Sequence, residues 1–164
     1  MDPGALRPGG GKPVSAHGLA YNQTFWAALA AWTIAQSIKL AVRLITRREF
    51  DFSVFLSTGG MPSAHTAMAV ALATSVGLTT GWDGPMTALA IAFAGVVMFD
   101  AQSVRRAAGL QARLLNQIVQ ELFKNHHLSQ QKLAELLGHT RMEVFMGMLT
   151  GIFTALAVHA NWAR

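Results

Sequence analysis

Long stretches without charged residues divide the chain. No Asp, Glu, Lys or Arg occurs in Pro13–Ile38, Phe52–Trp82, Gly84–Phe99 or Val144–Ala163. A helix crosses a bilayer with about 20 largely apolar residues, and Pro85–Phe99 lacks the polar face that helices of soluble bundles carry. The pattern predicts an all-α, polytopic membrane bundle of about four spanning helices. The alternative is a soluble helical bundle with a very apolar core.

Turn-forming and charged residues bound the predicted helices. The spanning helices are predicted at Gln23–Leu44, Pro62–Gly77, Pro85–Asp100 and Arg141–Trp162. Ala101–Asn116 has the periodicity of an amphipathic helix lying at the membrane surface, and Leu128–Gly138 that of a short helix. Residues 1–18 are rich in Gly and Pro and are predicted to form a disordered tail. Residues 19–164 then form one membrane-embedded domain.

The composition agrees with a membrane protein. Charged residues make up 13% of the chain, against about 25% in average soluble proteins. The chain has no cysteine, which excludes disulfide and thiol chemistry. The net charge of +5 would favour anionic lipid, and the bilayer, rather than nucleic acid, is the expected partner.

The predicted topology gathers most cations at one membrane face. Ten of the 13 Lys and Arg residues fall there: Lys39, Arg43, Arg47, Arg48, Arg105, Arg106, Arg113, Lys124, Lys132 and Arg141. The positive-inside rule therefore predicts a plasma (inner) membrane protein with this basic face in the cytoplasm and both termini outside.

The segment Gly59–Thr66 (GGMPSAHT) places a turn, a hydroxyl and a histidine at a predicted helix start. Helix starts offer unpaired N–H groups and a positive dipole end, so they attract phosphate. A histidine there can transfer a proton near neutral pH. Alone, this motif only hints at an oxyanion site, but the predicted topology brings other polar residues to the same face: Lys39, Arg47, Arg105, Arg106 and His139.

Four segments together resemble the superfamily of type-2 phosphatidic acid phosphatases and vanadium-dependent haloperoxidases, and especially its small, divergent bacterial branch. They are Ala35–Lys39, Gly59–His65, Met98–Asn116 and Leu137–Gly147. The resemblance covers nearly the whole chain from Trp32 onward. It implies a reduced form of the phosphatase core and the hydrolysis of phosphomonoesters or diphosphates.

The resemblance also implies roles for individual residues. The catalytic set is His139 as nucleophile, His65 as general acid, and Glu143 as the carboxylate four residues after His139. The phosphate-binding set is Lys39, Arg47, Ser63, Arg105 and Arg106, with Arg105 favoured over Arg106. Asp100 is predicted to support the site, by positioning the arginines through ion pairing or by a direct catalytic role.

The chain departs from the usual motifs at several points. Lys39 to Arg47 is one residue longer than the common spacing, and Ala64 stands between serine and histidine. Arg105 and Arg106 precede His139 by more than thirty residues instead of six. Ser103 replaces the usual glycine before the paired arginines, and a Glu replaces the usual Asp after the nucleophile.

The chemistry of phosphate-ester hydrolysis independently requires these residue types. Lysine and arginine can stabilise the phosphate oxygens without a metal. A carboxylate one helical turn from His139 can fix the tautomer of its ring. His65 can protonate the leaving alkoxide. No metal or other cofactor is expected, and the His126-His127 pair is assigned no role.

Structural explanations exist beside the catalytic ones. Thr140–Glu143 is also a capping box, and Pro62-Ser63 is typical of ordinary helix initiation. Lys39 would also snorkel to the membrane interface, and Arg47 would also orient the chain. Either histidine would also fit a hydrogen-bonded interfacial position.

The leading hypothesis is a metal-independent lipid-phosphate phosphatase at the cytoplasmic leaflet that forms a phosphohistidine intermediate. Phosphatidylglycerophosphate or phosphatidic acid is the expected substrate. The alternatives are a prenyl phosphate or diphosphate phosphatase, a non-catalytic protein that binds anionic lipid or a partner through its basic face, and a haloperoxidase. With so few helices, a homodimer that completes the bundle is compatible with the small-residue helix faces.

Overall fold

The computed structural model describes residues 17–47, 60–122 and 139–162. These residues form α1 (His17–Ala20), α2 (Gln23–Arg47), α3 (Ala64–Thr80), α4 (Pro85–Phe99), the π-helical η2 (Asp100–Val104), α5 (Arg105–Leu122) and α6 (Arg141–Trp162). Among these described residues, three helical stretches are long and apolar enough to cross a membrane: Gln23–Thr46, Pro85–Val119 and Arg141–Trp162. Helix α3, which contains most of the remaining predicted span, is not among them. The all-α membrane bundle predicted from the sequence is confirmed.

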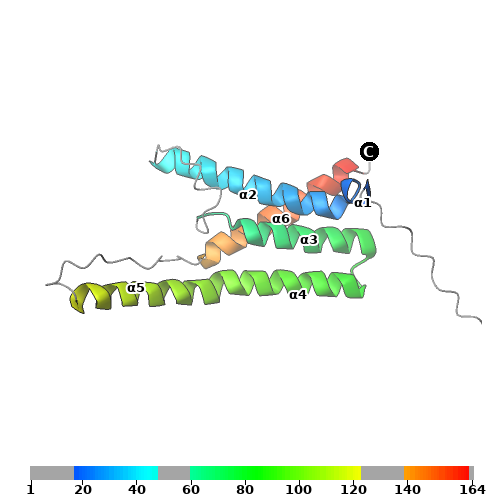
Figure 1. Cartoon of the computed structure of the whole chain (residues 1–164). Helices are drawn as coiled ribbons and strands as arrows, with labels where there is room; N and C mark the ends of the chain where they lie inside the picture. Colours follow the sequence, from blue (N-terminus) through cyan, green and yellow to red (C-terminus); the bar gives the residue numbers. More distant parts are fainter. Residues whose placement is uncertain (1–16, 48–59, 123–138, 163–164) are drawn as a thin grey trace, which may run out of the picture.

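Helix α3 is the centre of the bundle. It packs against α2, α4 and α6, and α2 also contacts α6. With 17 residues, α3 is about 25 Å long. It is shorter than α2 and α6 and slightly longer than α4. The end of α2, the start of α3, the end of α4 and the start of α6 lie at one end of the bundle (Figure 1). This arrangement agrees with the predicted order of membrane crossings.

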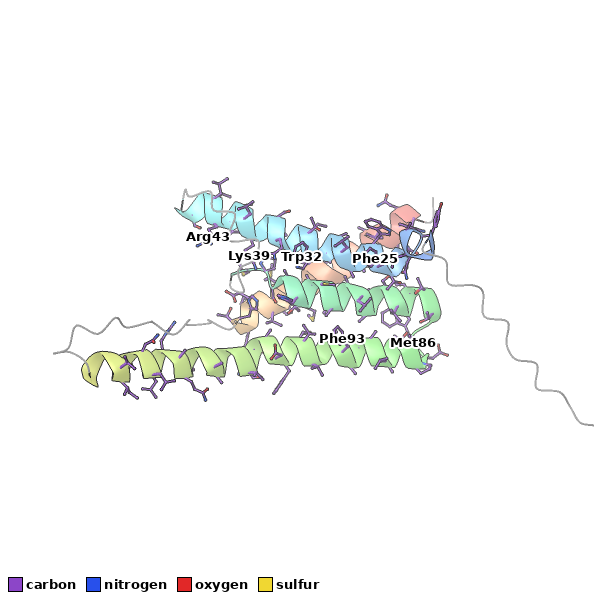
Figure 2. All side chains as sticks on the ribbon, in the orientation of Figure 1. Phe25, Trp32, Lys39, Arg43, Met86 and Phe93 are labelled. Carbon is purple, nitrogen blue, oxygen red and sulfur yellow. The ribbon has the colours of Figure 1, made fainter. Side chains whose placement is uncertain are left out.

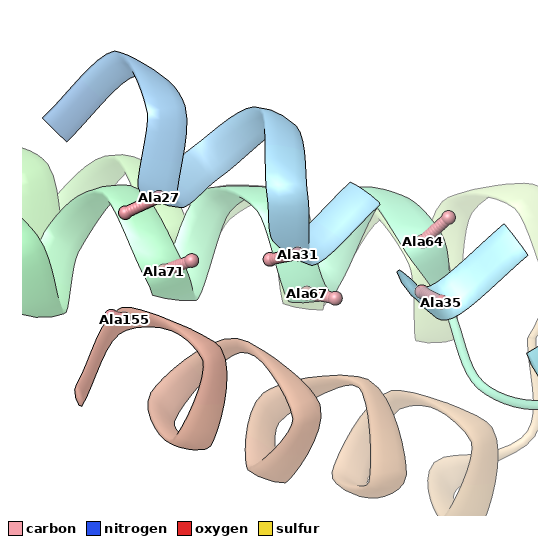
Figure 3. Close-up of a cluster of buried hydrophobic side chains, with 7 residues drawn as sticks. All are labelled: Ala27, Ala31, Ala35, Ala64, Ala67, Ala71 and Ala155. Atoms are coloured by element: carbon pink, nitrogen blue, oxygen red, sulfur yellow. The ribbon is translucent and has the colours of Figure 1, made fainter. Parts of the chain in front are cut away.

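Alanine and glycine make the contacts between α2, α3 and α6. A cluster of buried alanines joins the three helices (Figure 3): Ala27, Ala31, Ala35, Ala64, Ala67, Ala71 and Ala155. On α6, a Cβ added at Gly147 would lie 2.6 Å from the Ser63 carbonyl oxygen, and one at Gly151 would lie 2.5 Å from the Ala67 carbonyl oxygen. Small residues four apart let helix backbones approach closely in lipid, so α6 lies directly on α3.

Large apolar side chains cover the outside of the bundle, as a hydrocarbon surrounding requires. On α4, Leu89, Phe93, Val96 and Phe99 are each more than half exposed. Phe93 and Met86 are labelled among the α4 side chains in Figure 2. Because α4 contacts only one side of the bundle, most of its surface is available to lipid.

Helix α5 corrects one prediction. Ala101–Asn116 is helical as predicted, but η2 and α5 continue the direction of α4 (Figure 1) instead of lying across the end of the bundle. The backbone N–H of Asp100 donates hydrogen bonds to the carbonyls of both Val96 and Val97, so the helix continues past Phe99. Position 103 is a serine and not the more flexible glycine, which would favour a break in the helix. The stretch Pro85–Val119 is about 50 Å long, well beyond the roughly 30 Å hydrocarbon core.

Other boundaries agree closely with the sequence. Helix α6 has the predicted bounds, α2 continues three residues further, to Arg47, and α3 begins at Ala64 because Ser63 is its N-cap. The predicted tail falls almost wholly outside the described residues. The same is true of the predicted helix Leu128–Gly138 and of the His126-His127 pair.

Candidate active site

His139 and Glu143 form a hydrogen-bonded pair at the start of α6. Nδ1 of His139 lies 3.0 Å from Oε2 of Glu143, and only 4% of His139 is exposed. The same carboxylate oxygen accepts a hydrogen bond from the Thr140 backbone N–H, and Thr140 Oγ1 accepts one from the Glu143 N–H. The predicted capping box and the predicted histidine–carboxylate pair are therefore the same structure.

Two backbone hydrogen bonds fix this pair against the other helices. The His139 N–H donates to the carbonyl of Ala101 in η2 at 3.1 Å. The Ser63 N–H, at the start of α3, donates to the carbonyl of Glu143 at 3.0 Å. The starts of α3 and α6 and the π-helical segment after α4 are thus held together around one histidine.

Ser63 acts as the N-cap of α3. Its side chain is fully buried, its Oγ accepts a hydrogen bond from the Thr66 hydroxyl at 3.0 Å, and it lies 3.5 Å from the Thr66 backbone N. The structural explanation of Ser63 as a helix-initiating residue is therefore correct. Its predicted role in phosphate binding stays a prediction, since Ser63 does not line the cavity described next.

His65 and His139 share a cavity. Its volume is about 240 Å³, and it is lined by His65, Val96, Val97, Asp100, Ala101 and His139. This volume is many times the roughly 10–15 Å³ that a cavity needs to hold one water, so the cavity has room for a group much larger than water. Two imidazoles and a carboxylate, separated by up to 74 positions in the sequence, thus face one space beside the end of α4.

Lys39 is the predicted phosphate-binding lysine on α2. It is 6% exposed and interacts electrostatically with Glu143. Its stem runs beside Gly60, whose added Cβ would lie 3.4 Å from the Lys39 Cγ. Gly60 has φ +94°, a conformation that favours glycine. The turn before α3 therefore packs directly against the aliphatic part of the Lys39 side chain. Figure 2 labels Lys39 and Arg43 toward the same end of α2.

For the predicted phosphate-binding arginines, the structure describes the backbone and not the side chains. Arg47 is the last residue of α2, and Arg105 and Arg106 are the first two residues of α5, directly after η2. All three lie on elements that reach the same end of the bundle (Figure 1). Their side chains fall outside the described part of the structure, so their contact with phosphate stays a prediction.

Some contributors were not predicted from the sequence. Thr66 holds the Ser63 hydroxyl, and the Ala101 carbonyl anchors His139. A serine before a helix indicates an N-cap, but neither the Thr66 hydroxyl contact nor the Ala101 backbone contact leaves a pattern in the sequence. At the other end of the bundle, Ser75 Oγ lies 3.1 Å from Thr24 Oγ1 and 3.0 Å from His159 Nε2.

The site contains oxygen and nitrogen donors but no compact metal-binding group. Within residues 17–47, 60–122 and 139–162, no three His, Asp or Glu side chains are close enough together to hold a metal ion. What the described residues can supply is a nucleophilic nitrogen, a proton donor and positive charge.

Comparison with known proteins identifies the family. The sequence model described as "Divergent PAP2 family" matches residues 20–154. The chain belongs to the divergent PAP2 family. It is also similar to "Uncharacterized membrane protein YuiD" of Bacillus subtilis (strain 168), with 42% identity over 151 residues, 85% of this chain and 96% of the relative. No solved structure matches the chain.

Family membership confirms the resemblance found in the sequence and relates the chain to phosphatases. The three apolar helices and the membrane-protein relative support an integral membrane location. The matched range includes every predicted site residue, from Lys39 to Glu143.

Proposed function

We propose that this divergent PAP2 protein is a lipid-phosphate phosphatase that works through a phosphohistidine on His139. The observation that carries the proposal is the shared cavity of His65 and His139, with Glu143 at Nδ1 of His139. A nucleophile, an acid and the group that orients the nucleophile are what the two-step transfer of a phosphoryl group requires.

In the first step, Nε2 of His139 attacks phosphorus and the bond from phosphorus to the lipid oxygen breaks. Glu143 accepts the Nδ1–H and so keeps the lone pair on Nε2. His65 gives its proton to the departing alkoxide, which leaves as the lipid alcohol. In the second step, His65 takes a proton from water, the resulting hydroxide attacks the phosphohistidine, and inorganic phosphate is released with His139 restored.

Positive charge near the cavity would stabilise the transition state. Lys39 is a buried cation that interacts electrostatically with Glu143 of the proposed catalytic pair. Arg105 follows Asp100 by five residues, the spacing that a π-helical turn brings together. A carboxylate lining a phosphate site repels the substrate unless a cation lies between them. We therefore assign Asp100 the role of positioning Arg105, with Arg106 and Arg47 as further phosphate-binding cations.

The substrate is proposed to be a phospholipid of the cytoplasmic leaflet. The positive-inside rule favours a cytoplasmic location for the basic end of the bundle and for the cavity there. That side carries lipid phosphates of the phosphatidylglycerophosphate or phosphatidic acid type. Prenyl phosphates remain in the test panel because they present the same monoester chemistry to the same groups.

The test is phosphate release from purified protein in detergent, with phosphatidylglycerophosphate, phosphatidic acid and a prenyl phosphate as substrates. His139→Gln should abolish measurable release, and His65→Gln should lower kcat by about 10²- to 10⁴-fold. His159→Gln is the matched control, because His159 is bonded to Ser75 far from the cavity, and it should keep wild-type activity. A folded wild-type protein that releases phosphate from none of these lipids would overturn the proposal.

A further inference from the structure

A second hollow lies beside the candidate active site. It has a volume of about 480 Å³ and is formed by α3, α4 and α6, with Val70, Leu78, Ile91, Gly95, Met148 and Ile152 among its lining residues. Thr74 is the one polar side chain in that lining. Ligand pockets typically measure about 300–1,000 Å³, so this apolar groove is large enough to hold a ligand.

The helix packing explains the shape of the groove. Helix α3 packs against both α4 and α6 and therefore forms the floor, while α4 and α6 form the walls. Gly95 adds no side chain to the α4 wall, and an added Cβ there would meet no atom within 4 Å. Leu78, Ile91 and Leu156 line the groove and are also exposed. The groove is therefore open along the surface that faces hydrocarbon.

The groove and the cavity of His65 and His139 are neighbours along α4, on different sides of the helix. Gly95 and Met98 line the groove, and Val96 and Val97, which lie between them in the sequence, line the cavity of His65 and His139. At its other extremity the groove reaches Trp82, in the turn between α3 and α4. Because the two hollows are neighbours, a lipid with its phosphate in the cavity has an apolar groove within reach of its tail.

We propose that the groove between α3, α4 and α6 binds one hydrocarbon tail of the substrate while its phosphate lies in the cavity of His65 and His139. This inference rests on the proposed function and extends it. The tail enters sideways from the bilayer, because the groove opens to lipid. The enzyme should therefore discriminate between lipid phosphates by tail length, and Gly95 determines how much of the tail the groove accepts.

The experiment compares two phosphatidic acids, dipalmitoyl and dihexanoyl, in the same detergent. Gly95→Phe should narrow the groove, since Gly95 lines it and the space at its Cβ is open. It should lower kcat/KM for dipalmitoyl phosphatidic acid about tenfold or more relative to the dihexanoyl form, in line with the discrimination of apolar pockets. Ala92→Phe is the matched control: Ala92 is exposed on α4 but does not line the groove, so the ratio should stay at the wild-type value.

A binding measurement tests tail binding in the groove independently of the proposed phosphatase activity. A photoactivatable palmitoyl phosphatidic acid should crosslink to the wild type and to His139→Gln, and Gly95→Phe should remove the crosslink. If the wild type hydrolyses both lipids and Gly95→Phe leaves their ratio and the crosslink unchanged, the groove inference is wrong while the phosphatase stands. If Gly95→Phe instead converts a dimer to a monomer without changing the ratio, the groove holds a second copy and the inference is also wrong. If no lipid phosphate is hydrolysed, the proposed function fails, and crosslinking alone decides whether a tail binds.

Discussion

Oε2 of Glu143 lies 3.0 Å from Nδ1 of His139 and 2.9 Å from the backbone nitrogen of Thr140. One carboxylate oxygen thus caps α6 and orients the candidate nucleophile. The two tasks differ in what they require. Capping needs an acceptor, which an amide oxygen also supplies, whereas holding the histidine through an imidazolium-like transition state needs the negative charge.

Glu143→Gln should separate these tasks. We expect the thermal stability to change little, because the capping acceptor is kept, and kcat/KM for a lipid phosphate to fall on the order of 10²- to 10⁴-fold. Thermal denaturation and phosphate release measured on the same preparation check this. Glu143→Ala removes the cap as well, so it should lose both stability and activity. Wild-type activity in Glu143→Gln would leave the carboxylate with a capping role alone.

Asp100→Asn tests the carboxylate in the cavity. If Asp100 positions Arg105, the change should raise the KM for phosphatidic acid by about three- to tenfold and alter kcat less, since substrate binding is what the arginine improves. Steady-state kinetics on the purified variant give both values. A lowered KM would mean that Asp100 only repels the substrate, and the positioning role would be wrong.

Gly147→Ala should destabilise the bundle. The added methyl group would lie 2.6 Å from the Ser63 carbonyl oxygen and 3.1 Å from the Thr66 Cβ, and overpacking of this kind costs about 1–3 kcal/mol. Gly95→Ala, in open space on α4, is the control and should be neutral or slightly stabilising. Unfolding of both variants in a denaturing detergent measures the difference, and equal stabilities would contradict the close approach of α6 to α3.

The orientation can be tested with two single cysteines, because the chain contains none. Asp83 lies in the turn between α3 and α4, and Arg141 begins α6 at the opposite end of the bundle; both are exposed. An impermeant maleimide should label Asp83→Cys in intact spheroplasts and should label Arg141→Cys only after the membrane is opened. The reverse pattern would place the cavity of His65 and His139 outside the cytoplasm.

Most of the fold follows from the sequence because the bilayer imposes a strong and simple constraint. Uncharged stretches of spanning length predicted the helices, and the α6 boundaries agree to the residue. The course of α5 was not predictable in the same way. An amphipathic pattern shows that one face of a helix is apolar, but only the hydrogen bonds at Asp100–Val104 decide whether the helix bends there or continues α4.

The candidate site was predictable in part. The motifs identified His65, His139 and Asp100, and the structure brings these three residues to one cavity. The sequence pattern could not show that Ser63 is fully buried at the cap of α3. A local pattern indicates where a helix begins, but it does not indicate which other parts of the chain pack over that position. The groove beside the cavity was also missed. It arises from the relative placement of three helices and from a glycine that leaves space, and neither leaves a pattern along the chain.

The alanine cluster between α2, α3 and α6 reverses the usual sensitivity of a protein core to mutation. In a soluble core, shortening a large side chain is the damaging change, since it leaves an empty volume. The side chains of this cluster are already only methyl groups, and α6 contacts α3 largely through backbone atoms. A gain in size at these helix crossings is therefore the damaging change, because it would push apart α3 and α6, the helices next to which His65 and His139 are held.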